Sequence, residues 1–142
     1  MKALLRTIPV AVCLAAVTFL LIRNARNKPH FLDAETITYA KQYIRFQNVR
    51  ASAKADYRGQ TVGFLHIDVA NNGPRAIKEL DVELWFWDTS GNVFATEHAT
   101  AVSPRLRPLG PGQTRDFLHG FDLKDSWNHT SPTIRIDYLE LK

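Results

Sequence analysis

The chain has 142 residues, a length typical of one domain, and a formal net charge of +4. Five basic residues and no acidic residue occupy positions 1–28, which leaves a net charge of −1 on the other 114 residues. This distribution argues against a nucleic-acid-binding domain, because such a domain needs a basic face on its folded part. The only cysteine, Cys13, lies in an apolar segment, which excludes an intrachain disulfide scaffold and a thiol nucleophile in the domain.

A long apolar stretch near the N-terminus predicts a membrane anchor. Residues 4–22 contain one charge, at Arg6, and at about 1.5 Å per residue they reach about 28 Å, close to the ~30 Å hydrocarbon core of a bilayer. Residues 23–28 are basic and offer a poor cleavage site, and Cys13 does not stand where a lipoprotein signal places its cysteine. We therefore expect one uncleaved transmembrane helix within an N-terminal segment 1–28, in contact with the lipid bilayer through residues 4–22.

The side of the membrane is less strongly indicated. Two basic residues, Lys2 and Arg6, precede the uncharged residues 7–22 and three follow them, so the positive-inside rule does not decide the orientation. The terminal position of the apolar stretch is typical of a signal anchor. We therefore expect the domain that follows it to lie on the exterior.

Beyond this segment the pattern changes from a linker to strands. Residues 29–42 form a linker with a possible short helix over 33–42, because Asp33 is a favourable N-cap and Glu35 follows in the first turn. Further along, apolar residues recur at every second position, which predicts strands over 43–53, 61–71, 78–88, 92–102, 114–122 and 133–141. The pattern predicts an all-β domain over 43–142, an antiparallel β-sandwich of six or seven strands.

The strand over 78–88 shows how its two faces differ. The predicted core face carries four apolar residues: Leu80, Val82, Leu84 and Phe86. The opposite face carries two acids and two tryptophans: Asp81, Glu83, Trp85 and Trp87. Successive side chains of a strand point to opposite faces, so both tryptophans are expected outside the core.

Trp85 and Trp87 are candidate partner-binding residues, because tryptophan dominates binding hot spots and bulky aromatic pairs are unusual on the surface of a free monomer. We expect Phe64, on the preceding strand, to join them. Two other interpretations stay open. Residues 33–44 or the chain's own loops cover the two indoles, or the indoles contact the membrane interface, where tryptophan is enriched.

The remaining polar residues give no pattern for catalysis, a metal or a cofactor. The five histidines lack metal-ligand spacing, although His66 and His119 lie on predicted strands where they are candidates to meet. A Gly-x-Ser-x-Gly nucleophile turn is absent. Residues 88–92 are interpreted as a hairpin turn, with Gly91 at the position of positive φ, rather than as a calcium loop. We therefore predict a protein that is not an enzyme and binds neither metal nor cofactor.

Several turns and strands between Gly59 and Phe121 form a recognisable series. They comprise the alternating strand Leu65-His66-Ile67-Asp68-Val69, the turn Asn71-Asn72-Gly73, the strand that ends at Trp87, the hairpin at 88–92 and the turn Leu109-Gly110-Pro111-Gly112-Gln113. In this series the chain resembles the FxLYD-type domains and related bacterial membrane-anchored domains of unknown function. The resemblance implies an immunoglobulin-like fold, a place on the exterior, periplasmic side of the inner (cytoplasmic) membrane, and a non-catalytic role.

Two functions remain open at this point. The first is a membrane-anchored accessory or protein-interaction module that docks on a partner membrane or envelope protein. The second is a binding module for a small apolar or cell-envelope ligand. A flat, exposed surface at Trp85 and Trp87 would favour the first, whereas a concave apolar pocket with a few convergent polar groups would favour the second.

Overall fold

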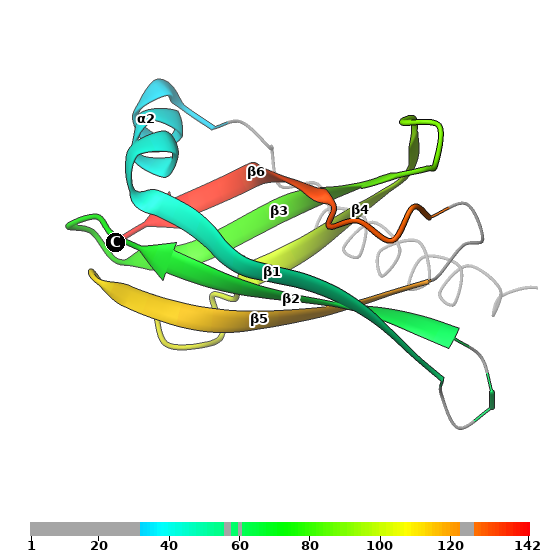
Figure 1. The fold of residues 1–142 in the computed structure, drawn as a ribbon. Helices are drawn as coiled ribbons and strands as arrows, with labels where there is room; N and C mark the ends of the chain where they lie inside the picture. The colour runs from blue at the N-terminus through cyan, green and yellow to red at the C-terminus, as the bar shows by residue number, and fades with distance from the viewer. Residues whose placement is uncertain (1–31, 56–57, 60, 123–126) are drawn as a thin grey trace, which may run out of the picture. The chain divides into compact units, whose positions relative to one another are not determined.

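The computed structural model describes residues 32–55, 58–59, 61–122 and 127–142. In this part of the chain, the elements follow one another in the order α2 (Ala34–Tyr43), β1 (Ile44–Ala55), β2 (Thr61–Asn71), β3 (Ile77–Trp87), β4 (Val93–Val102), β5 (Gln113–Asp122) and β6 (Thr133–Leu141). The strands form two antiparallel sheets in the orders β1-β2-β5 and β4-β3-β6, which pack face to face (Figure 1). The predicted antiparallel sandwich is confirmed, with six strands in the described residues and each predicted strand end within two residues of its observed position.

The predicted anchor over residues 4–22 lies outside the described residues. Within the described residues, no helix combines the length and the apolar character needed to cross a bilayer.

The core lies between the two sheets and follows the predicted alternation. From β2, Leu65, Ile67 and Val69 are buried, and the residues between them are only half-buried. From β3, the four predicted core residues are all buried: Leu80, Val82, Leu84 and Phe86. The prediction of which face of β3 points inward is therefore confirmed.

Helix α2 begins at an N-cap and packs against the sandwich through its buried side. Asp33 caps its first turn, with Oδ1 accepting a hydrogen bond of 2.7 Å from the backbone N–H of Thr36, as predicted for this residue. That hydrogen bond, with a second from the Thr36 hydroxyl, lowers the pKa of Asp33 below its usual value. Further along the helix, Tyr39 and Ala40 are buried against the core, so α2 packs as part of the folded unit that contains the strands.

A buried asparagine holds the place where the chain crosses from one sheet to the other. Asn71 is fully buried at the end of β2, and its Nδ2 donates to the carbonyl oxygens of Arg75 at 2.8 Å and Leu109 at 3.0 Å. Its Oδ1 accepts from the backbone N–H of Gly73 at 3.1 Å. A buried amide with all its partners specifies this crossing, because a buried polar group without partners would cost stability.

Strand β1 contains a β-bulge that changes which residues face the core. The pairing with β2 passes from Gln47 opposite Asp68 to Arg50 opposite His66, so two residues of β1 stand opposite one of β2. Asn48 adopts a positive φ of 50°, which asparagine tolerates better than most residues. The extra residue turns both Phe46 and Val49 toward the core, although three positions separate them.

Candidate functional site

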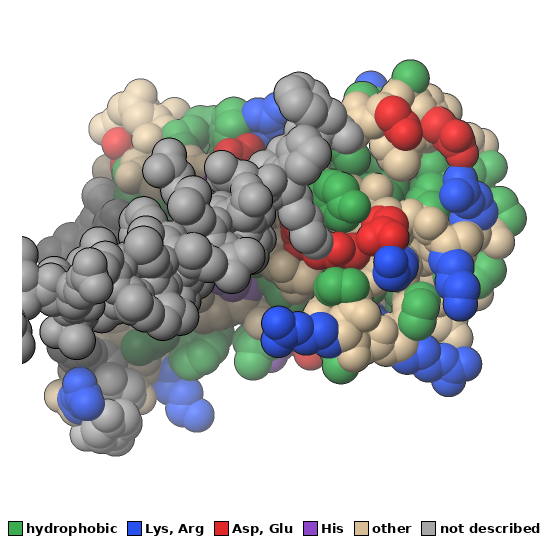
Figure 2. Space-filling view, turned by 180° about the vertical axis from the view of Figure 1, so that it is seen from behind, with side chains coloured by type: hydrophobic (Ala, Val, Ile, Leu, Met, Phe, Trp, Pro, Cys, Tyr) green, Lys and Arg blue, Asp and Glu red, His purple; other side chains and the backbone are tan. Residues whose placement is uncertain are grey.

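The outward side of β3 carries the two candidate tryptophans, and we call it the β3 outer face: Asp81, Glu83, Trp85 and Trp87. All four side chains are half-buried, because β3 is the central strand between β4 and β6. Figure 2 views the molecule from behind, on the side of this sheet, and shows acidic side chains gathered beside basic and apolar ones in the described part of the surface.

Each tryptophan of the β3 outer face is held by strand β6. The central guanidinium carbon of Arg135 lies 4.6 Å from the centroid of the Trp85 ring, in cation–π contact. The indole Nε1 of Trp87 donates a hydrogen bond of 3.0 Å to the hydroxyl of Thr133. The Trp85 indole Nε1 is buried, and within the described residues no acceptor lies within hydrogen-bond distance of it. The two indoles are therefore ordered side chains, and Trp85 retains an unused donor.

Acidic groups surround the tryptophans on this sheet. The imidazole of His98 on β4 lies between two carboxylates, with Nδ1 3.4 Å from Oδ2 of Asp137 and Nε2 4.0 Å from Oε1 of Glu83. One carboxylate oxygen of Asp81 is buried, and it too lacks a hydrogen-bond partner in the described part of the chain. Carboxylates therefore flank the two indoles on this sheet.

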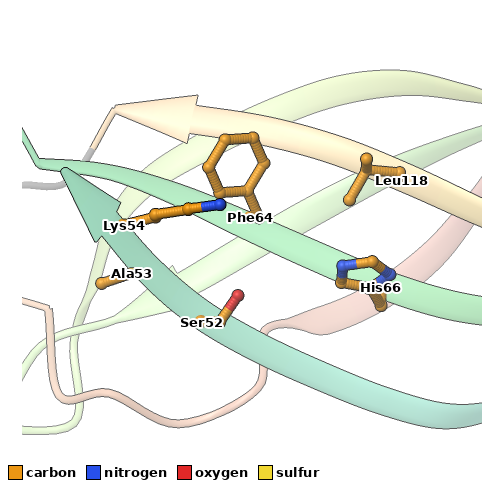
Figure 3. A pocket seen from close by; sticks show the side chains of 6 residues that line it. All are labelled: Ser52, Ala53, Lys54, Phe64, His66 and Leu118. Atoms are coloured by element: carbon orange, nitrogen blue, oxygen red, sulfur yellow. The ribbon is translucent and has the colours of Figure 1, made fainter. Parts of the chain in front are cut away.

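Phe64 does not join the tryptophans. Strand β2 belongs to the sheet β1-β2-β5 and β3 to the other sheet, so Phe64 lies on the opposite side of the sandwich. It lines a shallow, open pocket of about 380 Å³ with Ser52, Ala53, Lys54, His66 and Leu118 (Figure 3). In Figure 3 the rings of Phe64 and His66 and the side chain of Leu118 project from β2 and β5 on the same side of the sheet. The expectation of one aromatic cluster was wrong because the chain changes sheets after Asn71.

His66 and His119 also fail to meet. Their strands are neighbours, but His66 pairs with Leu118 and His119 with Leu65, which places the two imidazoles on opposite faces of the sheet. His66 lies 3.9 Å from a carboxylate oxygen of Asp116, and the Nε2 of His119 lies 2.7 Å from Oε2 of Glu97. The second contact joins β5 to β4 and closes that edge of the sandwich. Among the residues described, no three histidine, cysteine or carboxylate side chains gather as a metal site would require.

The predicted hairpin at residues 88–92 is confirmed. The Oδ1 of Asp88 accepts hydrogen bonds of 2.8 Å from the backbone N–H groups of both Asn92 and Ser90, and Gly91 has a φ of 81°. These hydrogen bonds, that from Asn92 above all, lower the pKa of Asp88. The carboxylate thus closes the turn.

A groove lies at the other edge of the sandwich, between β1 and β6, and we call it the edge groove. It has a volume of about 310 Å³, and helix α2 forms one of its walls. Its apolar lining consists of Leu32, Ile37, Ala40, Phe46, Ile134 and Ile136, and its two polar lining residues are Lys41 and Arg135.

Comparison with known proteins found no matching family model, no matching curated protein and no matching solved structure. Function is therefore inferred from the geometry of the chain itself.

Proposed function

We propose that this chain is a non-catalytic, membrane-anchored accessory module with an immunoglobulin-like sandwich, and that it docks on a partner membrane or envelope protein through the β3 outer face. The observation that carries the proposal is the ordered pair of indoles at Trp85 and Trp87. Arg135 and Thr133 already hold these rings, so less side-chain entropy is lost when a partner covers them. Ordered tryptophans are the side chains that most often dominate a protein interface.

The chemistry of the face also indicates what the partner offers. The carboxylates of Asp81 and Glu83 lie on the same face as the two indoles and favour a basic side chain nearby. We therefore expect a contact surface with at least one lysine or arginine.

Photocrosslinking in intact cells tests this proposal. A benzoylphenylalanine at Thr96 or Thr100, exposed β4 positions that pair with Trp85 and Asp81, should give one discrete adduct with an integral membrane or envelope protein. The same probe at Gln47 or Asp116, exposed positions on the other sheet that both pair with Asp68, is the matched control and should give none. The adduct should disappear when Trp85→Ala and Trp87→Ala are combined. Equal adducts from both sheets, or an adduct that survives the double substitution, would contradict the proposal.

The anchor and the exterior location are part of the same proposal. The support is the apolar stretch 4–22 with basic residues on both sides. N-terminal sequencing of the purified protein should find the chain uncut, and a mature start between residues 20 and 35 would contradict an anchor. A reporter that is active only outside the cytoplasm, fused after Lys142, should be active, whereas a silent reporter at normal expression would move the domain to the cytoplasm.

Binding of a small apolar ligand is the second candidate, and the edge groove favours it. Small-molecule sites are concave and mostly apolar, with a few placed polar groups, and the edge groove has this composition.

A further inference from the structure

The edge groove exists because two edge strands face each other without pairing. Strand β1 ends one sheet and β6 ends the other, so their outer backbone edges do not share a ladder. Helix α2 packs against both strands, and farther along the Ser131 hydroxyl lies 3.5 Å from the carbonyl oxygen of Val49. On the opposite side of the sandwich, the contact between His119 and Glu97 closes the corresponding edge. The edge groove lies on the side where α2 packs.

The residues that line this opening belong to the core but remain partly accessible. Phe46, Ile134 and Ile136 pack against the core cluster, yet each is only half-buried, and Ile37 on α2 is 36% exposed. Apolar surface gains about 25 cal/mol for each Å² removed from water, so these side chains favour an apolar occupant. The β1 bulge contributes to this lining, because it lets Phe46 and Val49 both face inward.

One cationic side chain accompanies this apolar lining. Lys41 on α2 is exposed, and it forms no ion pair with a carboxylate among the residues described. Arg135 also lines the groove, but its guanidinium lies over Trp85 on the outer face of the sheet, toward β3. An anionic group at the groove would therefore meet one cation, Lys41, that is not already neutralised.

We propose that the edge groove binds a single hydrocarbon chain that carries an anionic head group, such as a carboxylate or a phosphate. The hydrocarbon chain occupies the apolar lining, and the head group lies near Lys41. The volume of the groove favours one hydrocarbon chain over two, because about 310 Å³ lies at the lower end of the ~300–1,000 Å³ range of small-molecule sites. Hydrogen bonds between cations and anionic oxygens are the stronger kind, which gives the site its preference for a charged head.

The membrane is a ready source of such a ligand, and this step rests on the proposed anchor. Leu32, which lines the groove, follows the predicted span at Ile22 by ten residues. A free fatty acid and a membrane phospholipid share the required chemistry, and the experiment distinguishes them.

The test uses the full chain in nanodiscs of phosphatidylcholine and photoactivatable probes. One arm adds dodecanoic acid with a diazirine at the end of its chain, and the other builds a phosphatidylglycerol with a diazirine in one acyl chain into the disc. After irradiation, labelled peptides are mapped by mass spectrometry. Labelling concentrated in residues 32–46 and 133–136 by either probe supports the proposal, and the probe that labels identifies the source. Labelling spread evenly over both sheets would overturn it.

Substitutions that change the groove without touching Trp85 complete the test. Ile37→Glu places a negative charge beside the apolar lining and should reduce groove labelling by about tenfold or more, and Lys41→Gln should reduce it by about three- to tenfold. Leu118→Glu and Lys54→Gln make the same chemical changes on the other sheet and should leave labelling within about twofold. Unchanged labelling in both Lys41→Gln and folded Ile37→Glu would overturn the proposal. If Ile37→Glu does not fold, the labelling of Lys41→Gln and the map of labelled peptides test the proposal without it. The photocrosslinking from β4 tests partner docking and the diazirine labelling tests ligand binding, so either proposal can be contradicted while the other stands.

Discussion

The guanidinium of Arg135 stacks on the indole of Trp85, with 4.6 Å between the guanidinium carbon and the ring centroid. The same residue lines the edge groove on the other side of β6, so this strand contributes to both proposed surfaces. A cation–π contact with tryptophan contributes about 0.5–1 kcal/mol at an exposed site, and this contact helps to hold the indole in one orientation. Trp85 is therefore positioned for contact from outside the sandwich rather than committed to the core.

This arrangement predicts how much the two tryptophans contribute to stability. Leu84→Ala removes a fully buried side chain and should cost about 2–5 kcal/mol of unfolding free energy. Combined Trp85→Ala and Trp87→Ala should cost less than about 3 kcal/mol, the lower limit for truncating one buried tryptophan, because both rings are only half-buried. Urea unfolding followed by circular dichroism measures both. A loss of more than about 3 kcal/mol in the double variant would mean that the indoles are core residues.

The sequence was a good guide to features that depend on neighbouring residues. Alternation with period two identified the inward side chains of β3, the turn residues identified the hairpin at Gly91, and Asp33 identified the start of α2. Leu118, which is 54% exposed, follows the same alternation beside Phe117, and its exposure could have been predicted in that way.

Features that depend on how strands assemble were not accessible from the sequence. Phe64 was placed beside the tryptophans because β2 and β3 are consecutive, whereas the chain crosses to the other sheet between them. The edge groove likewise depends on β1 and β6 ending different sheets on the same side. The three-residue spacing of Phe46 and Val49 was the one local signal of the bulge, since strict alternation would have sent one of them to solvent.

A reciprocal pairing of glycine and phenylalanine gives a second stability test. On β2 and β5, Gly63 stands opposite Phe121 on the inner face, and Phe64 stands opposite Gly120 on the outer face. A Cβ at Gly63 would overlap the buried Phe121 ring, which also packs against Phe86 and Trp127.

Gly63→Ala should therefore lower the free energy of unfolding by about 1–3 kcal/mol through overpacking. In Gly120→Ala the new methyl would lie 3.9 Å from the nearest Phe64 atom, so this matched variant should change stability by less than about 0.5 kcal/mol. Equal effects in thermal unfolding would contradict the packing described for Phe121.

The hairpin carboxylate predicts a pH-dependent contribution to stability. The folded-state pKa of Asp88 is lowered from 3.8 by the hydrogen bonds from Asn92 and Ser90, so the folded protein binds fewer protons than the unfolded chain in the window just below that pH. The stabilisation is fully present above pH 3.8 and is lost as the pH falls through the lower folded-state value. Asp88→Ala should therefore lower the midpoint of thermal unfolding at pH 7, and the difference from the unchanged protein should narrow below pH 3.8. Asp88→Asn keeps an acceptor oxygen and should show a smaller difference that varies little with pH.

Helix α2 predicts where the shortest stable fragment begins. The Tyr39 hydroxyl lies 3.0 Å from Oδ1 of Asn71 and 2.8 Å from the carbonyl oxygen of Arg75, and the Tyr39 ring is buried. A fragment of residues 43–142 contains every strand but leaves this site without the ring. It should fold, yet unfold with at least about 3 kcal/mol less free energy than a fragment of residues 32–142, because loss of a buried aromatic costs about 3–5 kcal/mol.

Tyr39→Phe in the longer fragment separates the hydroxyl from the ring. It removes the hydrogen bonds alone and should cost about 1–3 kcal/mol, since the Asn71 oxygen then loses one of its partners in a buried place. Urea unfolding of the three proteins, at equal pH and salt, gives the comparison. Equal free energies of unfolding for the fragments 43–142 and 32–142 would mean that α2 does not stabilise the sandwich. The helical wall of the edge groove would then not be held in place by the core.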